Sequence, residues 1–255
     1  MSADLLKREL ARFLAAVMFL TRVPVPLLAH DSDMATASAR YYPLVGILIG
    51  AVAAAGFAGG LAIGGGVVGA LLATAATLLL TGAFHEDGLA DLFDGMGASS
   101  PARALEIMRD SRLGTFGAAA LFIVLALKVA ALAQLPAALA LAALIAVHGL
   151  SRLSALIVIA TSRYVRSDGT AKPVADSMNM SGLATAALIG IVILTGFALH
   201  TSLPLVGALM LGLTAGHILA RAAFERRLGG YTGDCLGAVQ QISEVGAYLA
   251  LLAWL

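Results

Sequence analysis

Four carboxylates lie close together in one short stretch of the chain. Residues 85–95 read HEDGLADLFDG and directly follow a long apolar segment. If this stretch is helical, Asp87, Asp91 and Asp94 stand at positions i, i+4 and i+7, within about a 60° arc, so three like charges stack on one face. A bound cation would relieve their repulsion. Carboxylate oxygens without Cys or clustered His select hard ions, which predicts Mg²⁺ or Mn²⁺ with a substrate phosphate completing the coordination.

Glu86 belongs to the same stretch but points about 100° away from the three aspartates on a helix, so it is a weaker ligand candidate. Gly88 and Gly95 would let a phosphate or another helix approach the backbone closely. The alternative interpretation is a solvated acidic helix end that marks the water boundary.

A second stretch, residues 109–117, reads RDSRLGTFG. Arg109 and Arg112 suit phosphate oxygens through forked hydrogen bonds. Ser111 or Thr115 can cap the helix that follows, whose N-terminal amides also favour an anion. The alternative is an ordinary cap beside arginines that only set membrane topology.

A third stretch, residues 229–237, reads GGYTGDCLG and opens the last apolar segment. A glycine-rich turn that enters a helix can hold a phosphate or a ribose, although such turns are weakly specific alone. Glu244 lies further along the same segment, where a charge is costly and indicates a function or a partner.

Other charges also lie inside apolar segments. His148, Ser151 and Arg152 are about one turn apart. For Arg152 two roles are open, a structural ion pair with Glu244 or a contact with a substrate phosphate. Lys128 is assigned no role, because a long side chain can be paired or can reach the membrane surface.

The elements that must position these residues are long and apolar. Of 255 residues, 60% are hydrophobic and only 12% are charged, against about one quarter in soluble domains. The net charge of +1 gives no indication of nucleic-acid binding. The single cysteine excludes an internal disulfide and predicts no zinc or redox site. We therefore expect a membrane protein in contact with lipid.

Segments of about 20 apolar residues are long enough to cross a bilayer as helices. Seven are predicted, near residues 41–61, 67–84, 116–134, 137–160, 183–200, 204–222 and 237–255. Short uncharged connections alternate with long ones that carry nearly all the Lys and Arg, which predicts a cytoplasmic N-terminus and cytoplasmic long connections. The predicted fold is all-α, a polytopic transmembrane helical bundle that forms one integral membrane domain over residues 1–255.

The apolar run in the N-terminal segment is too short to cross the membrane. Its apolar residues lie on one helical face opposite its basic residues, the two sets being Leu5, Leu6, Leu10, Phe13, Leu14 and Val17 against Lys7, Arg8 and Arg12. This pattern predicts an amphipathic helix on the membrane surface.

Five short segments carry a resemblance to a known family. They are residues 19–26 (FLTRVPVP), 41–46 (YYPLVG), 85–95, 109–117 and 232–234 (TGD). In this order, on a membrane chain of suitable length, they resemble the cobalamin 5'-phosphate synthases, also called adenosylcobinamide-GDP ribazoletransferases. Each segment is weak alone, but the ordered set runs almost end to end.

The resemblance implies a bacterial inner-membrane enzyme whose active site faces the cytoplasm. It would join adenosylcobinamide-GDP to α-ribazole or its 5'-phosphate and release GMP, with Mg²⁺ required. Its partners would be these small molecules and membrane lipid, with no nucleic acid. The oligomeric state and the accepted form of ribazole stay open.

The resemblance also implies roles for individual residues. The metal site would be Asp87, Asp91 and Asp94, the phosphate contacts would be Arg109 and Arg112, and Asp234 would be a metal, ribose or base candidate. Independently of the resemblance, Glu86 is a weaker metal candidate, and Ser111, Arg152 and Gly233 are further candidates for substrate binding. His85 is a second candidate for proton removal, and the incoming phosphate is a candidate nucleophile.

Two other functions remain open at this point. Residues 91–98 resemble the start of the CDP-alcohol phosphotransferase pattern, but Ser99 stands where that family has arginine, and its later paired aspartates are absent. A secondary transporter would account for Lys128, Arg152 and Glu244 inside the membrane, but the acidic residues gather at one face and no internal repeat is evident.

Overall fold

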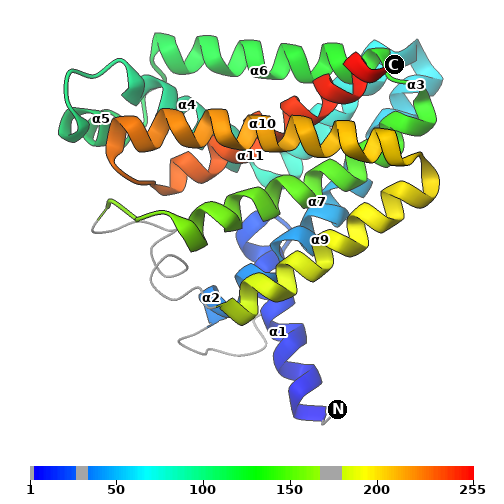
Figure 1. The fold of residues 1–255 in the computed structure, drawn as a ribbon, viewed down its shortest axis with the longest axis horizontal. Helices are drawn as coiled ribbons and strands as arrows, with labels where there is room; N and C mark the ends of the chain where they lie inside the picture. The colour runs from blue at the N-terminus through cyan, green and yellow to red at the C-terminus, as the bar shows by residue number, and fades with distance from the viewer. Residues whose placement is uncertain (1–2, 27–33, 167–179) are drawn as a thin grey trace.

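The computed structural model describes residues 3–26, 34–166 and 180–255, and within these ranges the chain is helical apart from its connections. Figure 1 shows the helices as one bundle. The helices are α1 (Ala3–Leu20), α2 (Met34–Ser38), the 3₁₀ helix η1 (Ala39–Tyr41), α3 (Tyr42–Thr81), α4 (Phe84–Met96), α5 (Pro101–Ile107), α6 (Thr115–Gln134), α7 (Ala137–Thr161), α9 (Met180–His200), α10 (Leu203–Leu228) and α11 (Gly233–Trp254).

Six of the described helices are long and apolar enough to cross a membrane. The first of these, Thr36–Thr81, contains two predicted spans because α3 folds back on itself at residues 64–65, where Gly65 takes φ +78°. A Cβ atom on Gly60 would lie 2.6 Å from the Cα atom of Gly69, so the two halves of α3 pack with their backbones in contact. Counted with this hairpin, the apolar segments match the seven that the sequence predicts, and the all-α membrane bundle is confirmed.

Two of the long, charged connections, residues 85–115 and 223–236, lie at one end of the bundle. Figure 1 shows α4, α5 and the α10–α11 connection at the left end, and the α6–α7 and α9–α10 connections with the C-terminus at the right. This arrangement agrees with the predicted alternation of long and short connections. The compartment that each end faces stays a prediction.

Helix α1 has the predicted bounds of the amphipathic segment. Its second half packs on the bundle, with Ala16 and Leu20 buried and the Phe19 ring stacked on Tyr42 at 5.5 Å between centroids. Its first half projects from the bundle (Figure 1), and Leu6 is 58% exposed there. The exposed apolar side chains are available to a membrane surface, as predicted.

Two apolar clusters form the core. One surrounds α4, η1, the end of α1 and the start of α11, with Leu89, Leu92 and Phe224 fully buried. The other lies in the opposite half of the bundle, around α7, the α3 hairpin and the end of α11, and includes Leu144, Leu209 and Leu251. The first cluster supports the end of the bundle where the charged stretches lie.

Candidate active site

Helix α4 crosses the start of α11 at two glycines. A Cβ atom on Gly88 would lie 2.9 Å from the Cα atom of Asp234, and one on Gly237 would lie 2.7 Å from the carbonyl oxygen of His85. Real Cβ atoms do not approach this closely, so the crossing requires glycine on both helices. It brings two of the predicted stretches together, residues 85–95 and 229–237.

A cavity of about 300 Å³ lies at this crossing. Its polar lining comes from His85, Asp87, Arg152 and Asp234, and aromatic rings of α1, η1–α3 and α4 form part of its apolar wall. Gly233 also lines it. Five predicted site residues from three separate helices therefore share one cavity.

Asp91 lies one helical turn beyond Asp87 on α4 and is partly buried. Burial, together with the nearby charges of Asp234 and Asp87, raises the pKa of the Asp91 carboxyl to about 7. The three carboxylates therefore repel one another at neutral pH. Uncompensated charge of this kind is typical of a site that is completed by a ligand.

The donor set of this region suits a hard cation, since three carboxylates with excess negative charge are what Mg²⁺ binds. The described part of the chain holds no group of three His, Cys, Asp or Glu side chains already arranged around one point. The predicted metal role of Asp87, Asp91 and Asp94 is not tested by this arrangement.

Asp94 has a structural role that spacing alone did not indicate. Its Oδ2 accepts a hydrogen bond of 2.7 Å from the backbone N–H of Gly114, and its Oδ1 accepts one of 2.8 Å from Gly117. These amides open α6, so Asp94 caps that helix from a neighbouring one and meets its positive end.

Glu86 lies apart from the cavity. It is 5% exposed and its Oε1 accepts a 2.9 Å hydrogen bond from Gln241 Nε2, while no hydrogen-bond partner satisfies Oε2. Burial raises the pKa of this carboxyl. The side chain points into the bundle, as the 100° offset from the aspartates predicts.

His85 lines the cavity and is buried. Burial, with a smaller contribution from the Arg152 charge, holds the pKa of His85 well below its ordinary value. A lowered pKa makes the imidazole a weaker base than an ordinary histidine, so the predicted role of His85 in proton removal rests on its position in the cavity and stays a prediction.

Helix α11 begins at a capped N-terminus. The Thr232 hydroxyl accepts a hydrogen bond from the Cys235 N–H, and Arg166 Nη2 forms an ion pair of 2.9 Å with Asp234 Oδ2. In the sequence, Arg166 is one of the basic residues of the long connections, and no motif marks it. Its position, a few residues after the apolar segment 137–160, does not indicate which residue it pairs with.

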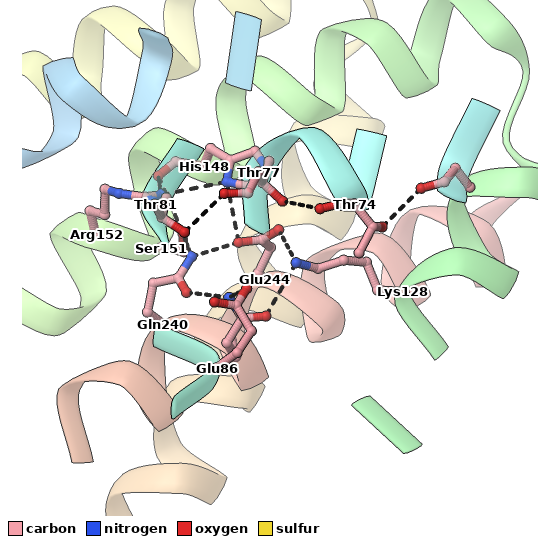
Figure 2. Close-up of polar contacts among 12 residues, drawn as sticks. Thr74, Thr77, Thr81, Glu86, Lys128, His148, Ser151, Arg152, Gln240 and Glu244 are labelled. Carbon is pink, nitrogen blue, oxygen red and sulfur yellow. Dashed lines mark hydrogen bonds and ion pairs between the residues drawn. The ribbon is translucent and has the colours of Figure 1, made fainter. Parts of the chain in front are cut away.

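The charges inside the bundle form a separate network (Figure 2). Lys128 Nζ lies 2.8 Å from Glu244 Oε1, and His148 Nδ1 lies 3.4 Å from Glu244 Oε2. Gln240 donates to the same carboxylate at 2.6 Å, and Gln241 accepts from Lys128 at 3.2 Å. The network joins α6, α7 and α11, and through Glu86 also α4.

Arg152 makes a different contact from the expected ion pair. Glu244 pairs with Lys128 and His148, whereas Arg152 Nη1 donates a 2.7 Å hydrogen bond to the carbonyl oxygen of His148. The predicted ion pair between Arg152 and Glu244 is therefore wrong. The side chain is 2% exposed and lines the cavity, and its Nε has no hydrogen-bond partner.

The stretch 109–117 contacts α4 through the backbone amides of Gly114 and Gly117, which donate to Asp94. Arg112 is exposed and forms an ion pair of 2.5 Å with Asp110, and this hydrogen bonding lowers the pKa of Asp110 to about 2. Arg109 and Ser111 are also exposed. The structure does not bring these three predicted substrate contacts into the cavity lining.

Comparison with known proteins identifies the family. The family model described as cobalamin-5-phosphate synthase matches residues 12–252. The chain belongs to this family. Its relatives include adenosylcobinamide-GDP ribazoletransferases from Ralstonia nicotianae (44% identical, covering 97% of each chain), Shewanella frigidimarina (43% identical, covering 96% of this chain and 95% of the relative) and Vibrio cholerae (38% identical, covering 99% and 97%).

No solved structure matches the chain. The family match confirms the resemblance that the five ordered segments carry. Four of those segments, residues 19–26, 41–46, 85–95 and 232–234, contribute residues to the lining of the cavity at the α4–α11 crossing.

Proposed function

We propose that this protein is a membrane-bound adenosylcobinamide-GDP ribazoletransferase. It would join adenosylcobinamide-GDP to α-ribazole or its 5'-phosphate and release GMP, the step that completes the nucleotide loop of the cobalamin coenzyme. The observation that carries the proposal is the single cavity in which His85, Asp87, Arg152 and Asp234 meet, in a chain that matches this family from residue 12 to residue 252.

The reaction exchanges one phosphorus–oxygen bond for another. A hydroxyl oxygen of the ribazole ribose attacks the phosphorus atom next to cobinamide, and the anhydride bond breaks so that GMP leaves with the bonding electron pair. The hydroxyl proton must be accepted, and His85 is one candidate because it lines the cavity. Asp234, in the same cavity, is the second candidate.

Mg²⁺ would be held by Asp87, Asp91 and Asp234 in this proposal. When bound, it would neutralise the charge that develops on the diphosphate oxygens. Asp94 is the weaker ligand candidate, because both of its oxygens already accept hydrogen bonds from backbone amides of α6.

Arg152 is the proposed contact for the phosphate that stays with cobinamide. The buried guanidinium lines the cavity and keeps an unsatisfied Nε–H, which would cost free energy if no ligand bound there. A phosphate oxygen would satisfy that donor and match its charge.

We infer that the site faces the bacterial cytoplasm from the inner membrane. The cavity lies at the end of the bundle where two of the long, Arg-rich connections lie, and such connections stay in the cytoplasm. Adenosylcobinamide-GDP carries a charged diphosphate, which favours a site at the membrane boundary over one inside the apolar bundle.

The proposal is tested by GMP release from purified protein in detergent or liposomes. The protein is given adenosylcobinamide-GDP and α-ribazole 5'-phosphate, with Mg²⁺ in one series and with a chelator in the other. We expect Mg²⁺-dependent GMP release together with a new corrinoid product. Absence of product in both series, from folded protein, would contradict the proposal.

A further inference from the structure

The segment after α7 is fixed to the loop before α11 by backbone hydrogen bonds. The Tyr231 N–H donates to the Arg163 carbonyl oxygen at 2.8 Å, and the Val165 N–H donates to the Tyr231 carbonyl oxygen at 3.0 Å. The rings of Tyr164 and Tyr231 also meet edge to face, 5.3 Å between centroids. These contacts therefore hold the backbone next to Arg166 against the start of α11.

The Arg166 side chain contacts the cavity through Asp234, which is one of its lining residues. Its Nη2 pairs with Asp234 at 2.9 Å, and only 11% of the side chain is exposed. Its Nε is buried and has no hydrogen-bond partner. One ion pair therefore leaves part of the donor capacity of a planar guanidinium unused.

Arg152 lines the cavity, and Arg166 lies beside it, paired with the lining residue Asp234. Arg152 is 2% exposed and is held by the carbonyl oxygen of His148, whereas Arg166 lies nearer to solvent, at the start of α11. A diphosphate has two phosphate groups, and one of them must leave the site with the nucleotide. A leaving group departs most easily from the side that faces solvent.

The charges explain why an arginine would lie beside carboxylates that also bind a cation. The carboxyl groups of Asp87, Asp91 and Asp234 lie near one another, and Arg166 compensates the charge of Asp234. A divalent cation would compensate the carboxylates itself, which would free the guanidinium for phosphate oxygens.

We propose that Arg166 is a substrate-binding residue that contacts the phosphate departing as GMP and compensates Asp234 until that phosphate arrives. This inference rests on the proposed transferase function and adds a residue that the sequence pattern did not assign. It predicts that Arg166 sets the affinity for the nucleotide phosphate and leaves ribazole binding unaffected.

The test measures binding of labelled GMP to the purified full-length protein by equilibrium dialysis with Mg²⁺. Arg166→Gln should weaken GMP binding by about 10- to 100-fold, the loss expected for a hydrogen bond to a charged group. The GMP affinity of Arg166→Lys should lie between those of the native protein and Arg166→Gln, because lysine keeps the charge but cannot form the paired hydrogen bonds of a guanidinium. Arg163→Gln is the matched control, since Arg163 is exposed in the same segment, and it should bind GMP normally.

A second readout separates phosphate contact from structural support. The KM for α-ribazole should be unchanged in Arg166→Lys, whereas the inhibition constant for GMP should rise. Native GMP affinity in both Arg166 variants, or an equal rise in both constants, would overturn the inference. Failure of the native protein to release GMP from adenosylcobinamide-GDP would instead overturn the proposed function, so the two failures are distinguishable.

Discussion

Two groups of charges in this molecule differ in how they are compensated. Inside the bundle, Lys128 and Glu244 are at most 3% exposed and pair with each other. At the α4–α11 crossing, three aspartates share one ion pair, with Arg166. Charges compensated within the chain hold helices together, because burial without a partner is prohibitively costly. Charges left in excess at a cavity indicate where a ligand supplies the missing partner.

Removal of one partner from the interior network should have the largest effect. Glu244→Ala leaves Lys128 buried and uncompensated, which should cost about 3–5 kcal/mol of stability and greatly reduce the yield of folded protein. The measurement is thermal unfolding in detergent, together with the monodisperse yield.

The double variant Lys128→Met, Glu244→Met should recover most of the stability that the single change loses, because neither charge is then left alone. Glu106→Ala is the surface control. It breaks the exposed pair with Arg103 and should change stability by less than about 1 kcal/mol. Equal effects of Glu244→Ala and Glu106→Ala would remove the distinction between the two groups of charges.

Changes at the cavity should affect turnover more than stability. Asp87→Asn removes one excess charge, so the folded protein should persist while kcat falls by about 10²–10³-fold, as for other groups that stabilise developing charge. Asp234→Asn should lower kcat by a similar factor and should also lower Tm modestly, because it leaves Arg166 without its ion-pair partner. Steady-state GMP release and thermal unfolding on the same preparations check both parts. A large fall in Tm with normal turnover would indicate that these aspartates support the fold and not the reaction.

Asp94 stands between the two groups, since it was predicted as a metal ligand and accepts hydrogen bonds from the first amides of α6. Asp94→Ala should cost about 1–2 kcal/mol through loss of the cap, with a smaller fall in kcat than Asp87→Asn. Asp94→Asn keeps one acceptor and should recover part of the stability. A loss of turnover equal to that of Asp87→Asn, without loss of stability, would favour the metal role.

The smallest effect concerns the pH dependence of stability. The pKa of Asp91 is raised to about 7 from an ordinary 3.8, so the folded protein binds this proton more tightly than the unfolded chain. Stability therefore falls as pH rises between about 4 and 7. In chelator, Asp91→Asn should raise Tm by a few degrees at pH 8 and progressively less toward pH 5.

The control for this pH effect is Asp110→Asn, because hydrogen bonds from Arg112 lower the pKa of Asp110 to about 2. This variant should not raise Tm at either pH. An Asp91→Asn gain that is the same at pH 5 and pH 8 would contradict the assigned repulsion.

Hydropathy was sufficient to predict the helices, because each span must satisfy its own backbone in lipid. The α3 hairpin was predicted as two apolar segments, 41–61 and 67–84, with a short connection between them, and the structure places its turn at residues 64–65. The aspartate spacing predicted that the three side chains share one face of a helix, but it did not predict which residues that face contacts. The cap that Asp94 provides for α6 and the contact of Glu86 with Gln241, 155 residues away, depend on helix packing. The Arg166–Asp234 pair was missed for the same reason.

The account is tested most directly by GMP release from native protein and Asp87→Asn, compared across a Mg²⁺ titration with adenosylcobinamide-GDP and α-ribazole 5'-phosphate. The account predicts Mg²⁺-dependent release by the native protein and a rate about 10²–10³-fold lower from folded Asp87→Asn at every Mg²⁺ concentration. Release within tenfold of native by folded Asp87→Asn at saturating Mg²⁺ would contradict the claim that the uncompensated carboxylates at the α4–α11 crossing carry out the reaction.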